Sequence, residues 1–182
     1  MLEITIPKME LFDESDSSFM TYDEKTISLE HSLLAISKWE SKYKKPFLSN
    51  GLTIEEFAYY IKCMDESDNL DYHYCLNIPN SIKNKISDYV YDKKTATTVN
   101  YIGNQNSKKE IITSELVYYW MVAMRIPFEC ERWHFSRLMT LIEVCSVKNS
   151  EGDKNSKMSK ADTLRHNAAL NAKRRAAKAK KS

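Results

Sequence analysis

The stretch from Glu110 to Val147 reads EIITSELVYYWMVAMRIPFECERWHFSRLMTLIEVCSV and contains two apolar helical patterns that meet at Pro127. The segment Leu116–Met124 is apolar on nearly every side, which predicts a helix at the centre of the fold. The second pattern has apolar residues at helical spacing, namely Phe135, Leu138, Met139 and Ile142. Because the residue before a proline is disfavoured in the helical region, the chain should turn at Ile126 and form an αα-hairpin.

The N-terminal half combines strand and helix patterns. Alternating apolar residues in Leu2–Ile6 and Thr26–Glu30 predict a small pair of antiparallel strands, with an acidic loop at Asp13–Ser18 between them. Three helices follow, the second of them opened by the capping box Thr53-Ile54-Glu55-Glu56, at residues 32–44, 54–64 and 79–90. β-branched residues predict a short strand at Thr95–Tyr101. The sequence therefore predicts an α+β fold that is predominantly helical, with the strand pair packed on the helices.

Length and charge predict one body with an appendage. The chain has 182 residues, enough for one ordinary core. We expect a compact, mainly helical body at 1–148, a polar linker at 149–158 and a basic, alanine-rich helical extension at 159–182. Residues 1–147 carry 16 Lys or Arg and 22 Asp or Glu, whereas residues 148–182 carry 11 and 3. This asymmetry indicates either an electrostatic partner for the extension or a solubilising tail.

Few residues indicate a reaction centre. The chain has three glycines, and none lies in a phosphate-binding loop motif. Cys130 and His134 stand four residues apart, a spacing that suits two metal ligands, but no second pair has zinc-like spacing, so packing is the favoured interpretation. A Cys/His nucleophile pair stays open, because such residues meet only in the fold. We predict no enzyme activity, no cofactor and no metal.

The remaining composition predicts a cytosolic protein with reduced thiols. Four cysteines show no paired CxxC spacing, and the first residues, MLEITIPKME, lack a basic start followed by an apolar run. The longest apolar run, Leu116–Met124, is about half of what a bilayer crossing needs. No membrane partner is expected.

Two groups of side chains are candidates for partner contact. The segment RHNAALNAKRRAAKAKK in the extension clusters cations that can displace counterions from phosphates, but it lacks the interleaved aromatic residues that single-strand stacking requires. Trp39, Trp120, Trp133 and the tyrosines of the body most often indicate core, and an exposed recognition patch is the alternative.

The segments SLLAISKWESKYKKPFL, EIITSELVYYWM and IPFECERWHFSRLMTLIEV, with the basic C-terminal segment, resemble proteins encoded in the tail gene cluster of long, flexible-tailed bacteriophages and prophages. They look most like the tail assembly chaperones of that cluster. The resemblance covers most of the chain from about Ser28 and consists of packing residues. Family members are similar in having a helix-rich body and an extension, and are thought to coat the tape measure protein before the tail tube polymerises.

The resemblance implies a non-enzymatic chaperone in the cytoplasm of the bacterial host, with the tape measure protein or another tail protein as partner and a homo-oligomer as a further possibility. The implied contacts in the body are Trp39, Phe47, Trp120, Pro127, Phe128 and Trp133. Those in the extension are Arg165, Lys173, Arg174, Arg175 and Lys178. One departure is that the family's extension arises by translational frameshifting, whereas body and extension are continuous here.

Two other functions stay open. The chain can be a structural component of the virion tail, with the body making symmetric contacts and the extension clamping a neighbour. It can also be a nucleic-acid-binding accessory protein acting through residues 159–182, which requires a steep dependence of binding on salt.

Overall fold

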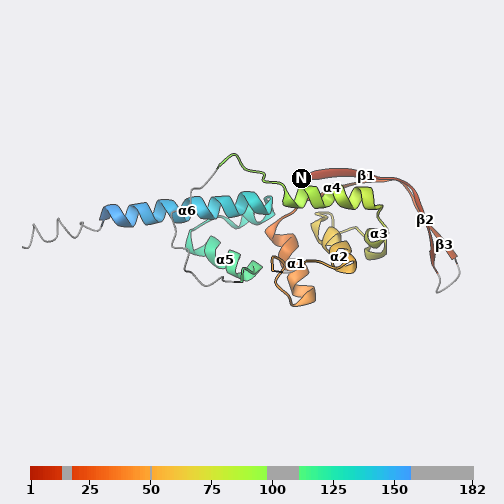
Figure 1. The fold of residues 1–182 in the computed structure, drawn as a ribbon, viewed down its shortest axis with the longest axis horizontal. Coiled ribbons are helices and arrows are strands. Elements are labelled where there is room, and N and C mark those ends of the chain that lie inside the picture. The colour runs from red at the N-terminus through yellow and green to blue at the C-terminus, as the bar shows by residue number, and fades with distance from the viewer. Residues whose placement is uncertain (14–17, 50, 98–110, 157–182) are drawn as a thin grey trace, which may run out of the picture. The chain divides into compact units, whose positions relative to one another are not determined.

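The computed structural model describes residues 1–13, 18–49, 51–97 and 111–156, and the chain divides into two compact units, Met1–Glu143 and Val144–Ser182. The fold is α+β and predominantly helical, as predicted (Figure 1). In chain order the elements are β1 (Leu2–Ile6), β2 (Met9–Asp13), β3 (Ser18–Tyr22), β4 (Lys25–Leu29), α1 (Leu33–Tyr43), α2 (Ile54–Met64), α3 (Tyr72–Leu76), α4 (Asn80–Tyr91), α5 (Ser114–Ala123), the 3-10 helix η1 (Phe128–Arg132) and α6 (Phe135–Ser156).

The predicted N-terminal strand pair is confirmed. β1 and β4 are antiparallel, with Ile4 opposite Ile27 and Leu2 opposite Leu29. Alternation places the apolar side chains on one face of the pair, where Ile4, Ile27 and Leu29 are buried. β1 packs against α4, so the pair covers one side of the helical body.

Strands β2 and β3 extend beyond this pair as a second two-stranded ribbon, which we did not predict. Phe12 lies opposite Phe19 and Leu11 opposite Met20. The loop expected at Asp13–Ser18 begins and ends on these strands, and its residues 14–17 lie outside the described residues. The ribbon escaped prediction because strand propensity depends strongly on context, and five residues with acidic members give a weak pattern.

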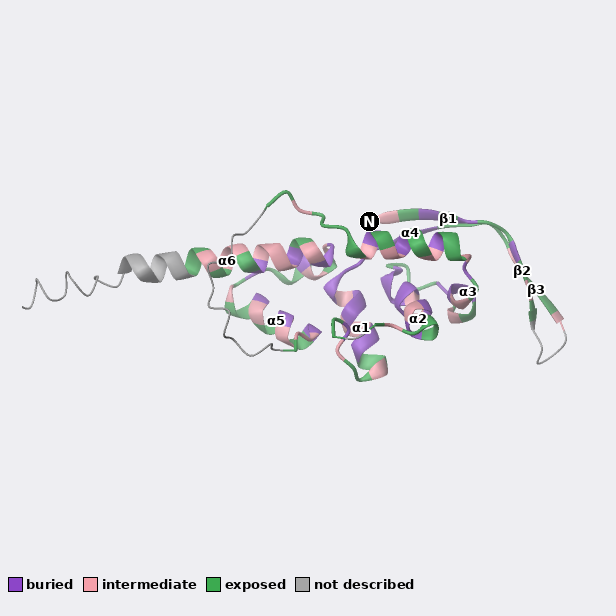
Figure 2. Cartoon of the chain, in the orientation of Figure 1, coloured by how far each residue is buried: buried purple, intermediate pink, exposed green. Residues whose placement is uncertain are grey.

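Helix α1 is the hub of the body, because it packs against α2, α5 and η1. It begins where the Ser32 hydroxyl accepts a hydrogen bond from the Ala35 amide at 3.2 Å, and it ends at Lys44, whose φ of 56° is left-handed. Trp39 is 2% exposed, and its indole Nε1 donates to the Glu56 carbonyl on α2 at 3.0 Å. The buried side of α1 is shown in Figure 2.

The capping box at the start of α2 is confirmed. The Glu56 amide donates to the Thr53 hydroxyl at 3.2 Å, and the Thr53 amide donates to the Glu56 carboxylate at 3.1 Å. Lys45 forms an ion pair with the same carboxylate at 2.7 Å. The sequence therefore located this helix start correctly, because both partners lie within four residues of each other.

We expect Thr53→Ala to lower the free energy of unfolding by about 1 kcal/mol, since one capping bond of α2 is lost. Urea denaturation followed by circular dichroism measures this loss. Thr53→Ser keeps a hydroxyl at the cap and is the matched control, expected to lie close to the wild type. An unchanged urea midpoint in Thr53→Ala would show that the cap contributes nothing.

A buried polar segment, Glu30–Ser32, joins β4 to α1. The Glu30 amide donates to the Met64 carbonyl at the end of α2 at 3.0 Å, and the Phe135 amide at the start of α6 donates to the His31 carbonyl at 2.6 Å. All three side chains of the segment are buried. The segment leads directly into α1 and is joined to α2 and α6 by backbone hydrogen bonds, and we call it the strap.

Helix α5 and the turn after it occur at the predicted residues, but the helix does not lie at the centre of the fold. The Thr113 hydroxyl caps α5, Arg125 adopts a left-handed φ of 56°, and the chain turns before Pro127. The expectation of a central helix was wrong: α5 buries Val117 and Met121 and packs chiefly against α1, while its other side is exposed. A helix that is apolar on nearly every side can be buried on every side, but the sequence does not show how many neighbours cover it. Here α1 covers only one side of α5.

The second helix of the Pro127 region is confirmed as amphipathic, with Phe135, Leu138 and Ile142 buried. α6 then continues to Ser156, so residues 149–156 are helical where a polar linker was predicted. The helix extends this far because adding residues to an existing helix is easier than starting one.

The division between the two units falls inside α6, five residues before the predicted end of the body at 148. The predicted extension at 159–182 and most of the predicted strand at Thr95–Tyr101 lie outside the described residues; the described residues 95–97 form no strand.

Candidate partner-binding surfaces

A buried carboxylate positions α5 against the hub helix. Glu40 of α1 accepts hydrogen bonds from the Ser114 amide at 2.7 Å, from the Ser114 hydroxyl at 2.6 Å and from the Phe47 amide at 2.8 Å. Its side chain is 7% exposed. Because three donors converge on one charged group, this contact fixes the start of α5 and thereby decides which side of α5 faces outward.

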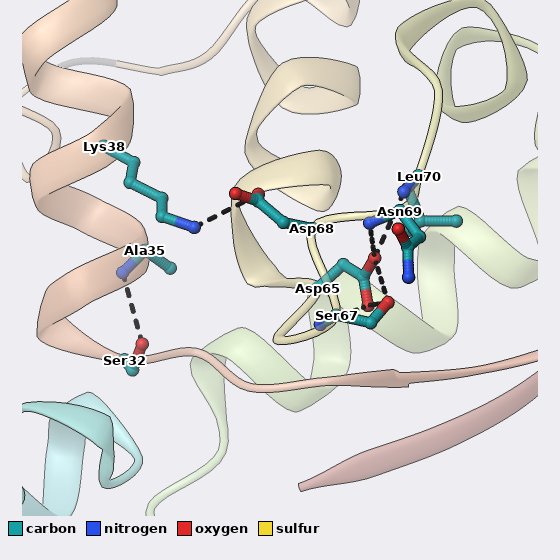
Figure 3. A network of polar contacts seen from close by, with 8 residues as sticks. All are labelled: Ser32, Ala35, Lys38, Asp65, Ser67, Asp68, Asn69 and Leu70. Carbon is teal, nitrogen blue, oxygen red and sulfur yellow. Dashed lines mark hydrogen bonds and ion pairs between the residues drawn. The ribbon is translucent and has the colours of Figure 1, made fainter.

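A second buried carboxylate closes the loop after α2 (Figure 3). Asp65 accepts hydrogen bonds from the amide and hydroxyl of Ser67 and from the amides of Asn69 and Leu70, at distances of 2.8 to 3.2 Å. The side chain of Asp65 is thus satisfied within its own loop. The hydrogen bonds therefore give Asp65 a structural role in shaping this loop.

The outward side of α5 exposes apolar side chains. Tyr119 is 65% exposed and Val122 is 60% exposed, and their spacing of three residues places them on one face of the helix. Phe128, at the start of η1, is 54% exposed. We refer to Tyr119, Val122 and Phe128 as the α5 outer surface. The ring of Tyr118, the neighbour of Tyr119 on α5, has its centroid 6.3 Å from that of Phe128, so η1 continues this side of α5. A contiguous patch of exposed apolar side chains is characteristic of protein interaction sites.

The partner-contact residues that the resemblance implies differ in how far the structure buries them. Trp39 and Phe47 are buried in the core, with ring centroids 5.2 Å apart, so they support the fold and offer no surface to a partner. Trp120 and Trp133 are half-buried, and the Arg137 guanidinium lies over the Trp133 ring at 4.1 Å. Pro127 and Phe128 are exposed. The basic residues Arg165, Lys173, Arg174, Arg175 and Lys178 lie outside the described residues.

A groove of about 620 Å³ lies between the start of α2, one side of α4 and the start of α6. Its apolar walls include Leu48, Leu52 and Ile54, and Ile54 is 68% exposed. Uncharged polar side chains of α4 also line it, among them Asn80, Asn84 and Ser87. A groove of this size and composition can accept apolar side chains of another molecule. No local sequence pattern indicates it, because its residues come from distant segments.

Two histidines of the strap region are buried next to each other. The His31 and His134 rings have centroids 5.1 Å apart. His31 Nδ1 forms a hydrogen bond with the Tyr60 hydroxyl at 2.5 Å, and His134 Nε2 forms one with the Tyr89 carbonyl at 3.1 Å. Burial lowers the pKa of His31 to about 3, with His134 as a second cause, and burial also lowers the pKa of His134. Both rings are therefore neutral at pH 7 and act as packed polar groups.

Three of the four cysteines, Cys63, Cys75 and Cys130, do not have the environment of a nucleophile. Burial raises the pKa of the Cys63 thiol and of the Cys75 thiol to about 12, and it raises the pKa of Cys130 as well. An activated thiol needs the opposite shift. Cys130 lies on η1, while His134 is engaged with Tyr89. Within the described ranges, no three His, Cys, Asp or Glu side chains are grouped in a way that could hold a metal ion.

In the described part of the chain, no helix combines the length and the apolar character needed to cross a bilayer. Comparison of the whole sequence and fold with protein-family models, with curated proteins and with solved structures finds no match in any of the three.

Proposed function

We propose that this chain is a tail assembly chaperone of a long-tailed bacteriophage or prophage, which binds the tape measure protein and keeps it soluble before the tail tube polymerises. The observation that carries the proposal is the α5 outer surface, where Tyr119 and Val122 stand exposed on a helix that is apolar on nearly every side. The resemblance in the Ser28-onward segments supplies the identity of the client.

The physical requirements of the role agree with this surface. A tape measure protein is a long helical chain with exposed apolar faces, so a holding protein must mask an apolar stripe reversibly. Exposed apolar side chains on one helix face can cover such a stripe in a helix-to-helix contact. Cations of the 159–182 extension add attraction for acidic client segments, and linked weak contacts raise the overall affinity without any single tight site.

Co-expression tests the proposal directly. The tape measure protein is expressed alone and together with this chain, and its soluble fraction is measured in each case. We expect the soluble fraction to rise when the chain is present, because a protein that binds the client's exposed surface shifts it away from aggregation. If the solubility of the tape measure protein is the same with and without the chain, the proposal is wrong.

We expect the double substitution Tyr119→Ser and Val122→Ser to weaken client binding by about tenfold or more, since an exposed aromatic anchor and its neighbour are lost. The free energy of unfolding should change by no more than about 0.5 kcal/mol, because both side chains are at the surface. Titration with a helical segment of the tape measure protein measures the affinity, and urea denaturation measures the stability.

Ile54→Ser is the matched control for this double variant. Ile54 is similarly exposed but lines the groove instead of the α5 outer surface. We expect it to bind the client as the wild type does. If Ile54→Ser loses binding and the α5 variant keeps it, the groove is the contact site and our assignment to α5 is contradicted.

A further inference from the structure

The β2–β3 ribbon exposes large apolar side chains and two strand edges. Phe12 and Phe19 pack against each other with ring centroids 5.1 Å apart, yet they are 53% and 74% exposed. Within the described residues the sheet contains these two strands only, so each strand has an outer edge that no described strand pairs with. A ribbon of two strands is marginally stable in water and gains stability from added strands or from packing.

The two outer edges of the ribbon differ in charge. β2 reads MELFD and carries Glu10 and Asp13, and charged side chains on an edge strand oppose pairing with another strand. β3 reads SFMTY and contains no charge, no proline and no glycine. The β3 edge therefore lacks the features that usually protect an edge strand.

We propose that β3 pairs in antiparallel orientation with β3 of a second copy of this chain, with Met20 on the two-fold axis. This register places Phe19 opposite Thr21 of the second copy, a favourable aromatic and β-branched pair. No charged residue of either strand meets its like. The product is a four-stranded sheet in the order β2–β3–β3–β2.

Charge explains why a second copy is the occupant and why assembly stops at two. Both chains supply an identical charge-free strand, so the two-fold contact satisfies both edges at once. The symmetric registers through β2 set Glu10 against Glu10, Glu10 against Phe12 or Leu11 against Asp13 of the other copy, so each brings charged residues onto the shared edge, which opposes pairing. In the four-stranded sheet both outer edges are β2, and their charges oppose the addition of further strands.

Disulfide trapping of the full-length chain tests the register. Directly opposed residues of antiparallel strands have Cα atoms about 4.5 or 5.5 Å apart, within the range that a disulfide spans. We expect Met20→Cys to give a covalent dimer on mild oxidation. Phe19→Cys and Thr21→Cys should each cross-link poorly alone and well when mixed, because each lies opposite the other. The wild type controls for the native thiols, among which Cys145 is half-buried.

Sedimentation equilibrium gives an independent reading. The wild type should be a dimer at micromolar concentration, and Met20→Lys should be a monomer because it places two like charges at the axis. Glu10→Lys, on the other strand, is the matched control and should stay dimeric. A wild type that is monomeric at all concentrations, or a Met20→Cys chain that cross-links no more than the wild type, overturns the proposal.

Discussion

Glu40→Ala is expected to lower the free energy of unfolding by about 4 kcal/mol. Each hydrogen bond to a buried charge contributes about 1.5–3 kcal/mol, and the donors that lose their acceptor stay buried. The substitution leaves the amides of Phe47 and Ser114 without their acceptor. Urea denaturation measures the loss. Because Glu40 joins α1 to the start of α5, client binding through the α5 outer surface should fall as well.

Two comparisons isolate the contribution of this carboxylate. Glu115→Ala removes an exposed acidic residue from the first turn of α5, which also accepts a long contact of 3.4 Å from the Ser114 hydroxyl, and should cost about 0.5 kcal/mol, mainly through the helix dipole. Glu40→Gln should fall between the wild type and Glu40→Ala, since an amide oxygen can still accept from one donor. A loss in Glu40→Ala no larger than in Glu115→Ala would show that Glu40 does not fix α5.

Acid is expected to destabilise the body through His31. Burial lowers its pKa to about 3 in the folded chain, whereas the unfolded value is about 6.5. Below pH 6.5 the unfolded chain binds a proton that the folded chain does not, so stability is present above that pH and is lost as the pH falls. Between pH 7 and 5 this amounts to about 2 kcal/mol, and the loss approaches about 4–5 kcal/mol towards pH 3.

Urea midpoints at pH 7.5 and 5.0 measure this acid sensitivity. His31→Gln should show a much smaller loss between the two pH values than the wild type. His73 lies on the exposed side of α3, and His73→Gln is the control expected to keep the full loss. If His31→Gln is as sensitive to acid as the wild type, another group causes the destabilisation.

Local signals were sufficient for much of the fold. The capping box at Thr53, the helix start near Ser32 and the alternation in Leu2–Ile6 each depend on residues close in sequence, and each appears in the structure as predicted. Helix α3 was missed because Tyr72–Leu76 is too short to show a period, although Asp71 caps it. The ribbon of β2 and β3 was missed for the same reason of weak local pattern.

Features that depend on distant residues could not be predicted. The strap at Glu30–Ser32 is polar and lies between two apolar segments, a composition that suggests a turn, yet contacts with α2 and α6 bury it. The apolar pattern of Leu116–Met124 could not show which side α1 would cover. By residue type Trp39 was more often a core residue, with an exposed recognition patch as the alternative, and its neighbours decide that it is core. The groove likewise exists only once three segments meet.

The central claim is that this chain works by offering the outer side of α5 to another protein chain. Amide hydrogen exchange of the full chain, measured with and without the tape measure protein, tests it most directly. We expect slower exchange in α5 and in residues 128–132 when the client is present, with β1 and β4 unchanged. If exchange in α5 and η1 is the same with and without a bound client, the outer side of α5 is not the contact surface.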